Sequence, residues 1–258
     1  PEFFTGGAKV IPIEAPHAKL RPADLTPVLT RGHGVHFPKL RALSLTQATE
    51  LGTVYTPDEL RALCDFAHGH GFAVHVDGAR FANAAATLGA RGHSPADLTW
   101  RAGIDALCFG GTKNGLLGTE AVVFFNRELA REFEYRVKQS GQLASKMRFA
   151  AAQWSAVLHD DAWLRHAAHA NRQAQALASG LTSLGFNLLA AVEANGVFVE
   201  FPPAVVAALE ARGWHFYKFV GEQGYRLMCS WETQDADIAA FLADARAATR
   251  GLGSAQKQ

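Results

Sequence analysis

The chain has 258 residues, 48% of them hydrophobic, and a formal net charge of +1. This length and apolar content predict one large or two modest domains with a sizeable core. The nearly balanced charge, without a block of Lys or Arg, excludes the usual electrostatic basis for binding nucleic acid, and no apolar run approaches the roughly 18 residues that span a membrane.

The cysteines and the first residues of the chain bear on its cellular context and its completeness. Three cysteines, an odd number and far apart in sequence, predict a reduced, cytoplasmic protein without a disulfide framework: Cys64, Cys108 and Cys229. The chain begins with Pro1-Glu2-Phe3, which has neither an initiator methionine nor the regions of a signal peptide. We therefore expect an N-terminally truncated sequence.

The first half of the chain alternates short apolar segments with helical patterns. Thr56, Pro57 and Glu59 form a helix start, because threonine caps a helix, proline suits the first helical position and glutamate completes a capping box. Strands are expected at 9–13, 40–46, 72–76, 104–109 and 121–125, and helices from about 21, from 57 to the glycines at 69 and 71, and over 80–88. Almost uniformly apolar strands that alternate with helices predict an α/β fold with a mainly parallel sheet covered on both faces.

After about residue 127 the pattern becomes that of a smaller α+β domain. Helical patterns occupy 128–137, 149–184, 203–212 and 235–248, and strands are expected at 197–201 and 225–231. We predict a large domain over 1–127, connecting helices and a small C-terminal domain over 128–250, and a flexible tail over 251–258.

Two predicted strands of the large domain end in a charged side chain, Asp77 and Lys113. Ligands of parallel sheets bind beyond the carboxyl ends of the strands, so the two side chains are candidates for one site. An aldehyde cofactor with a basic ring nitrogen needs both groups, an amine to form a Schiff base and an anion to keep the ring protonated. The alternatives are an exposed surface lysine and an aspartate that only caps the next helix.

The surroundings of Lys113 favour the cofactor interpretation. Glycines at 110, 111 and 115 would let a flat ligand approach the backbone, and burial of Lys113 would lower its pKa, as Schiff-base formation requires. The spacing is not that of a nucleotide-phosphate loop, since Asn114 follows the lysine.

Other charged and histidine side chains allow two interpretations each. Arg80 could pair with the aspartate or bind a carboxylate. Arg226 lies among apolar residues and would be costly to bury without an anion, so it either recognises a carboxylate or lies on an exposed edge strand. The histidine pairs at 68/70 and 166/169 have ligand-like spacing, but no third ligand is apparent nearby, and no metal site is predicted.

Two motifs resemble those of the low-specificity L-threonine aldolases, in the branch that includes bacterial phenylserine aldolases. They are His75-Val76-Asp77-Gly78-Ala79-Arg80 and Gly110-Gly111-Thr112-Lys113-Asn114-Gly115. Residues 44–50, 145–149 and 226–230 are similar to that branch as well, so the resemblance covers essentially the whole chain. It implies a pyridoxal-phosphate enzyme of the aspartate-aminotransferase fold (fold type I), acting on an amino-acid substrate as a homo-oligomer, either a dimer or a tetramer.

The resemblance also implies roles for individual residues. Lys113 would hold pyridoxal 5′-phosphate as a Schiff base, and Asp77 would pair with its ring nitrogen. Arg80 and Arg226 would bind the substrate carboxylate. Arg80 and Thr112 complete the residues expected around the cofactor, with Arg148 as a further candidate for its phosphate.

Two features depart from the family pattern. Many members have a histidine near the substrate hydroxyl in the loop after the strand at 40–46. Here that loop reads Gln47-Ala48-Thr49-Glu50, with Thr49 roughly at that position. In the family, the residue that stacks on the cofactor ring and the glycine turn around its phosphate lie upstream of Pro1.

The resemblance predicts retro-aldol cleavage of L-threonine, L-allo-threonine or phenylserine-type β-hydroxy-α-amino acids to glycine and an aldehyde. Two alternatives are a β-eliminating lyase with the same cofactor and a truncated fragment that does not hold the cofactor.

Overall fold

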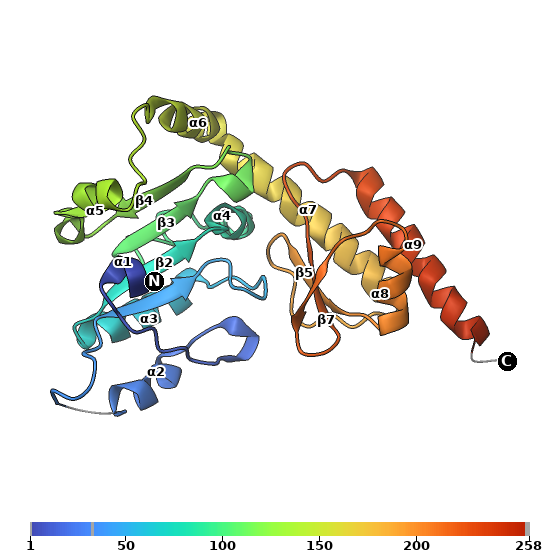
Figure 1. Ribbon diagram of the computed structural model, residues 1–258, viewed down its shortest axis with the longest axis horizontal. Helices are drawn as coiled ribbons and strands as arrows, with labels where there is room; N and C mark the ends of the chain where they lie inside the picture. Colours follow the sequence, from blue (N-terminus) through green and yellow to red (C-terminus); the bar gives the residue numbers. More distant parts are fainter. Residues whose placement is uncertain (1, 32–33, 256–258) are drawn as a thin grey trace.

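Two hydrophobic cores, each built against its own β-sheet, divide the chain into two parts (Figure 1). The computed structural model describes residues 2–31 and 34–255. The first part contains a four-stranded sheet of order β1-β2-β3-β4. Its strands are β1 (Ala42–Thr46), β2 (Ala73–Gly78), β3 (Ala106–Gly110) and β4 (Glu120–Phe124). The first three are parallel and β4 runs antiparallel to β3, which confirms the predicted mainly parallel sheet.

Three of the four helices of the first part were predicted, and the short N-terminal one was not. The four are α1 (Glu2–Thr5), α2 (Pro22–Leu29), α3 (Pro57–Gly69) and α4 (Phe81–Gly89). The capping box at the start of α3 is confirmed: Thr56 Oγ1 accepts the N–H of Glu59 at 3.3 Å, and the Glu59 carboxylate accepts the N–H of Thr56 at 2.7 Å. A cap of this kind contributes about 1 kcal/mol to helix stability.

Only one face of the first sheet is buried by the described residues, so the expectation of two covered faces is wrong there. Leu43 and Leu45 in β1 and Val74 and Val76 in β2 are buried in the core with α3 and α4. The residues between them, such as Ser44, are exposed or half-buried. This alternation follows from the two-residue period of a strand, which puts neighbouring side chains on opposite faces.

Two predictions near the N-terminus differ in outcome. The helix expected near residue 21 is α2. The strand expected at 9–13 is wrong, because that segment is irregular and Val10 is 58% exposed. Pro12 lies inside it and has no N–H to donate to a sheet, which opposes strand pairing.

The second part contains a three-stranded antiparallel sheet of order β5-β7-β6. Its strands are β5 (Gly196–Glu200), β6 (Tyr217–Val220) and β7 (Gly224–Met228), and helices α8 (Pro203–Glu210) and α9 (Asp235–Ala255) pack in the same core. The connecting helices are α5 (Phe133–Gln139), α6 (Arg148–Leu158) and α7 (Ala162–Ser183). Helices α5 and α6 contact the first sheet, where Phe133 packs on Phe124 and Trp154 packs on Phe109. Short 3-10 helices occur at Pro16–Ala18, Thr112–Asn114, Arg127–Ala130 and His159–Asp161. None of the helices in the described ranges combines the length and apolar character that a membrane span requires.

Three features of the second part were not predicted. The helical stretch at 149–184 is broken at Asp160 and Asp161, whose φ angles are 51° and 53°. Strand β6 was missed because all four of its residues are exposed, so no apolar alternation marks it. Helix α9 continues to Ala255, so the start of the tail predicted at 251–258 is helical, while 256–258 lie outside the described residues.

Helix α7 joins the two parts, because it contacts α4 on one side and α9 on the other (Figure 1). Asn83 of α4 and Asn171 of α7 are linked by reciprocal bonds: the Asn83 amide donates to Asn171 Oδ1, and the Asn171 amide donates to the Asn83 carbonyl, both at 2.9 Å. These bonds fix α4 against α7, the helix that continues into the second part.

Candidate active site

Neighbouring parallel strands bring Asp77 and Lys113 to the same edge of the first sheet. Asp77 lies in β2 opposite Cys108 of β3, near the carboxyl end of both strands. Lys113 lies in the 3-10 turn Thr112–Asn114, directly after β3. Both side chains are exposed at this edge. The sheet therefore presents an amine and a carboxylate where ligands of such sheets bind.

Asp77 is held by its own turn and keeps one oxygen free. Its Oδ1 accepts the N–H of Ala79 at 3.0 Å. Within residues 2–31 and 34–255 its other oxygen has no hydrogen-bond partner. This arrangement fixes the carboxylate and leaves one acceptor for an external N–H group.

Glu120 anchors the turn that carries Lys113. One oxygen of its carboxylate accepts the N–H of Gly111 at 3.0 Å, and the other accepts the N–H of Thr112 at 3.2 Å. Sequence reasoning missed this residue, although it begins β4 opposite Gly110. Both bonds are charge-assisted, so the turn is held more firmly than by neutral hydrogen bonds.

A second anchor holds the far side of the same turn. The Asn114 amide donates to the carbonyl of Trp163 in α7 at 2.9 Å, and the Asn114 carbonyl lies 3.1 Å from Nδ1 of His166. Lys113 itself makes no ion pair or hydrogen bond within the described part of the chain. The expected burial of Lys113 is wrong, and a fixed turn therefore presents an exposed, unpaired amine.

The glycines before Lys113 serve the close approach of backbone segments. A Cβ on Gly110 would lie 2.5 Å from the carbonyl oxygen of Ala79, and one on Gly111 would lie 2.5 Å from that of Thr119. A larger residue at 110 would push away the turn after Asp77, and one at 111 would displace the segment that leads into β4. These two glycines therefore allow the backbone segments of the site to pack closely. Their predicted role was to make room for a ligand.

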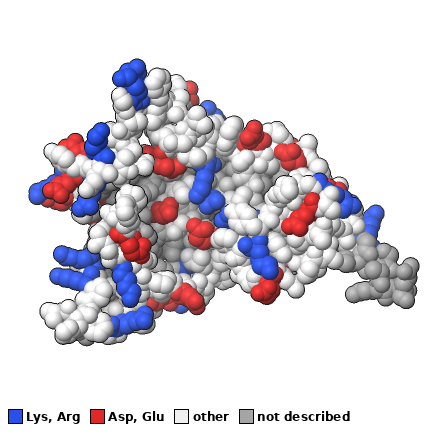
Figure 2. Space-filling view, viewed as in Figure 1, with Lys and Arg blue, Asp and Glu red and all other residues white. Residues whose placement is uncertain are grey.

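A small cavity of about 10 Å³ opens beside this edge, between the two parts of the chain. Its polar lining residues are Thr49, Glu50, Arg80, Asn195 and Arg226, and Phe198 and Met228 are among its apolar ones. Figure 2 shows basic and acidic side chains close together in the hollow between the two parts. The elements thus bring Arg80, from the turn after β2, and Arg226, from β7, to one cavity.

Arg226 is partly buried and short of hydrogen-bond acceptors. It lies on β7, the central strand of its sheet, so the alternative of an edge strand is wrong. Its guanidinium lies 4.7 Å from the ring centres of both Tyr217 and Phe219, and it donates to the Tyr217 hydroxyl. Its Nε is buried without a partner. The aromatic rings orient the cation, and its remaining donors suit a carboxylate.

The guanidinium of Arg80 also lacks hydrogen-bond acceptors. Its Nε is also buried without a partner. Burial lowers the pKa of Arg80, and the neighbouring Arg226 charge lowers it further. The negative charges of Glu50 and Asp77 act in the opposite direction. Two close guanidinium groups with unused donors form a site for an anion.

His75 lies on the same face of β2 as Asp77, inside a short polar chain. Its Nδ1 lies 2.9 Å from Ser44 Oγ, and its Nε2 lies 3.3 Å from Cys108 Sγ. Burial lowers the pKa of His75, while the Asp77 charge opposes that shift. Burial therefore favours the neutral imidazole, which links β1, β2 and β3 through Ser44 and Cys108 next to Asp77.

Of the remaining predicted residues, Thr112 lies next to Lys113, whereas Arg148 and the paired histidines are not among the residues that line the cavity. Thr112 is exposed next to Lys113. Arg148 begins α6, and its guanidinium lies 5.3 Å from the ring centre of Phe149, away from the residues that line the cavity. The paired histidines have other partners: His68 bonds to Asp105, and His169 bonds to the carbonyl of Thr233.

A larger cavity of about 440 Å³ lies inside the second part, among aromatic side chains such as Trp214, Phe216 and Phe241. Arg226 lines it as well, but Asp77 and Lys113 do not. Asp77 and Lys113 do not line the smaller cavity either, but Arg80, three residues after Asp77, does, so the smaller cavity is the better candidate.

Comparisons with known proteins give a consistent result. Residues 1–203 match the family described as beta-eliminating lyase. The chain is 51% identical to a low specificity L-threonine aldolase of a Pseudomonas species, over 96% of this chain and 71% of that protein. It is 52% identical to the low specificity L-threonine aldolase of Pseudomonas aeruginosa, over 95% of this chain and 70% of that protein.

Solved structures agree with the sequence relatives. The fold is similar to that of Leishmania major threonine aldolase, with a TM-score of 0.87 and 26% identity over 94% of this chain and 71% of that one. A Sphingomonas wittichii serine palmitoyltransferase has a TM-score of 0.64 at 18% identity, over 90% of this chain and 60% of that one, which is a likeness of fold alone.

Proposed function

Because the chain belongs to the beta-eliminating lyase family and, within it, to the low specificity L-threonine aldolases, we propose that it cleaves β-hydroxy-α-amino acids to glycine and an aldehyde. L-Threonine and L-allo-threonine are the proposed substrates, with phenylserine-type amino acids as bulkier ones. The protein is a pyridoxal 5′-phosphate-dependent lyase of fold type I, as are its relatives.

The residues at the sheet edge fit this cofactor. The unpaired amine of Lys113 can bond covalently to its aldehyde, and the free oxygen of Asp77 can accept the N–H of its protonated ring. Thr112, next to Lys113 with an exposed side chain, is proposed as a phosphate contact. This pairing of an amine and a carboxylate on neighbouring parallel strands is the observation that carries the proposal.

The chain's own residues bind and orient the substrate. Arg226 and Arg80 have unused donors and are proposed to bind its α-carboxylate from two sides. A carboxylate held in this way sets the orientation of the Cα–Cβ bond, which is a large part of the rate gain in such reactions. When bound, pyridoxal 5′-phosphate would supply a sink for the electron pair of this bond, and the Asp77 carboxylate would keep its ring nitrogen protonated.

A product assay tests the proposal directly. Incubation of the cofactor-loaded protein with L-threonine should release glycine and acetaldehyde in equal amounts. The family description makes β-elimination the second candidate, and it would release ammonia and a 2-oxo acid instead. Ammonia without glycine would therefore contradict the aldolase function and support the eliminating lyase.

Replacement of Arg226 by lysine should weaken substrate binding. Lysine keeps the charge but loses the planar pair of donors and the stacking on Tyr217 and Phe219. We expect the KM for L-threonine to rise roughly 10-fold or more, the scale of one lost charged hydrogen bond, with the cofactor absorbance retained. Arg246→Lys, at an exposed position of α9, is the matched control. An unchanged KM in the Arg226 variant would remove this arginine from the substrate site.

Replacement of Glu120 by alanine should loosen the Lys113 turn. The N–H groups of Gly111 and Thr112 lose both of their acceptors. Each such bond is worth about 1.5–3 kcal/mol, so the Kd for pyridoxal 5′-phosphate should rise roughly 10-fold or more. Absorbance titration measures this, with Glu134→Ala on α5 as the control. Equal affinity in the Glu120 variant and the control would show that the turn does not need this anchor.

The oligomeric state and the cellular compartment of the protein are further proposals. We propose a homo-oligomer, either a dimer or a tetramer, supported by apolar side chains exposed around α5 and α6, such as Tyr135 at 70% and Phe149 at 67%. Light scattering after gel filtration would measure its mass. The three free cysteines support the proposal of a reducing compartment, the cytoplasm.

A further inference from the structure

Cleavage of a β-hydroxy amino acid requires a base for the hydroxyl proton, and the residue predicted nearest to that role is already occupied. Thr53 donates its single hydroxyl proton to the His17 carbonyl at 2.8 Å. Thr49, 2.7 Å from the Thr53 hydroxyl, must therefore donate to it, and Thr49 also accepts the N–H of Thr53 at 3.2 Å. The Thr49 hydroxyl is thus committed to its own loop, and a hydroxyl is in any case a poor base at neutral pH.

The polar side chains around the cavity leave one group that can accept a proton. Arg80 and Arg226 are already protonated. The Asn195 amide is not basic, and it donates to the Cys229 carbonyl at 2.7 Å. The remaining polar lining residue is Glu50, which directly follows Thr49.

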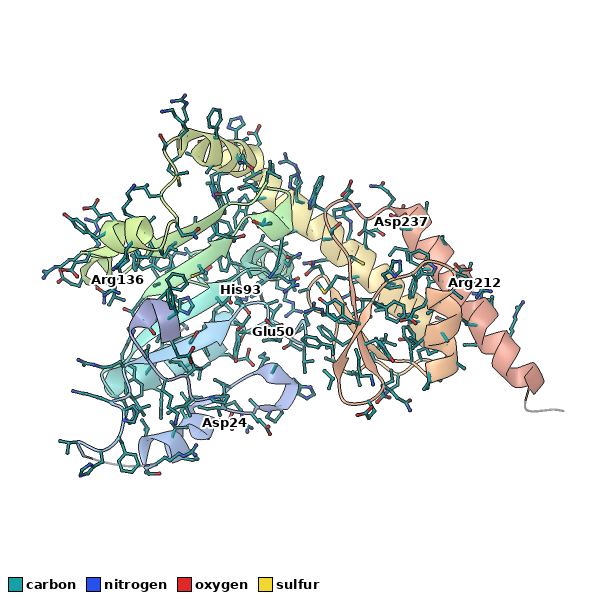
Figure 3. The ribbon with its side chains drawn as sticks, in the orientation of Figure 1. Asp24, Glu50, His93, Arg136, Arg212 and Asp237 are labelled. Atoms are coloured by element: carbon teal, nitrogen blue, oxygen red, sulfur yellow. The ribbon has the colours of Figure 1, made fainter. Side chains whose placement is uncertain are left out.

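Glu50 has the position and the freedom that this task requires. It follows β1, so it reaches the cavity from the same sheet edge as Asp77. Figure 3 labels it between the first sheet and the second part of the chain. Among the described residues no hydrogen bond or ion pair engages its exposed carboxylate. Glu50 lines the same cavity as Arg80, and its charge opposes the lowering of the Arg80 pKa.

The loop that carries Glu50 is held firmly at both ends. The Gln47 side chain bonds to the backbone of Tyr55 twice, at 2.9 and 3.0 Å. The carboxylate of Glu193, in the segment leading to β5, accepts the N–H of Val54 at 2.8 Å. A free carboxylate on a fixed loop meets the geometric demand on a general base.

We propose that Glu50 is the base that accepts the β-hydroxyl proton of the substrate, an inference that rests on the proposed aldolase function. In this step the O–H bond breaks and its proton passes to a Glu50 oxygen. The hydroxyl carbon becomes the aldehyde carbonyl as the Cα–Cβ bond breaks. Cα takes up one proton to give glycine, so the protons balance over the whole cycle, and no oxidant or reductant is involved.

The Glu50→Gln protein tests the role, because glutamine keeps the size of the side chain but cannot accept a proton. Three measurements are compared with the wild type and with Glu210→Gln, an exposed control on α8. They are the absorbance of bound pyridoxal 5′-phosphate, the exchange of glycine α-protons with deuterium in NMR spectra, and the kcat and KM for L-threonine. Glycine exchange needs the cofactor and the carboxylate site but involves no β-hydroxyl.

The expected result is a selective loss. In Glu50→Gln the cofactor absorbance, the glycine exchange and the KM should match those of the control, while kcat falls roughly 100-fold or more, the scale of a lost general base. An unchanged kcat would overturn the role, and so would an equal loss of glycine exchange, since Glu50 would then act only by positioning Arg80. A wild-type protein that exchanges glycine protons but releases no aldehyde from L-threonine would overturn the aldolase function itself, and this inference with it.

Discussion

The Lys113→Ala protein is expected to lose the visible absorbance of bound pyridoxal 5′-phosphate and to lose turnover by several orders of magnitude. Alanine removes the amine that bonds to the cofactor aldehyde, and loss of a covalent catalytic group has effects of this size. The turn should survive, because it is held by backbone and side-chain bonds of Gly111, Thr112 and Asn114, none of which involves the Lys113 side chain. Absorbance titration with the cofactor measures the first effect, and an aldehyde assay measures the second.

Lys138→Ala is the matched control, since this lysine is also exposed but lies on α5. Borohydride reduction followed by mass spectrometry of peptides should place the cofactor on Lys113 in the wild type and in the control. Attachment at another lysine, or an unchanged spectrum in Lys113→Ala, would contradict the proposed role of this residue.

The Asp77→Asn protein is expected to bind the cofactor more weakly and to turn over roughly 100-fold or more slowly, the scale of one lost electrostatic group at a reacting centre. Asparagine keeps the oxygen that accepts the N–H of Ala79, so the turn remains intact and only the charge is removed. Without the anion the cofactor ring loses its proton more readily and becomes a poor acceptor of electrons. Steady-state kinetics and cofactor titration measure both effects.

Asp65→Asn, on the exposed side of α3, is the control for Asp77→Asn. Comparison with Asp77→Ala separates charge from structure, because alanine also removes the turn bond. If Asp77→Asn kept the kcat of the wild type, the carboxylate could not be the partner of the ring nitrogen, and another anion would have to stabilise it.

Much of the first part of the chain was predictable, because the residues that determine its helices and strands lie close together in the sequence. Thr56 and Glu59 cap α3 through residues three apart, so the sequence pattern contains the whole interaction. The strand ends at Asp77 and Lys113 were predictable for a similar reason, since an apolar run that stops at a charged residue is visible without a fold. Strand β6 was missed because its burial does not alternate, so nothing local distinguishes it from a loop.

The candidate site was only partly predictable. Glu120 anchors the Lys113 turn from a different strand, and this contact exists only because β4 pairs antiparallel with β3. Thr49 was expected near the substrate hydroxyl, but its bonds with Thr53 leave Glu50 as the available base. Neither contact has a fixed spacing in sequence, because both depend on which segments the fold brings together.

The sequence by itself determined which groups are proposed to carry the chemistry, namely an amine, an anion and two guanidinium groups, since the kinds of side chain present limit the reactions that a site can perform. The tertiary structure alone decided how they meet. Arg226 comes from the second sheet and reaches the cavity beside Arg80 only through the way α7 joins the two parts. Contacts between distant segments depend on the packing of whole elements, and no local pattern of residues encodes that packing.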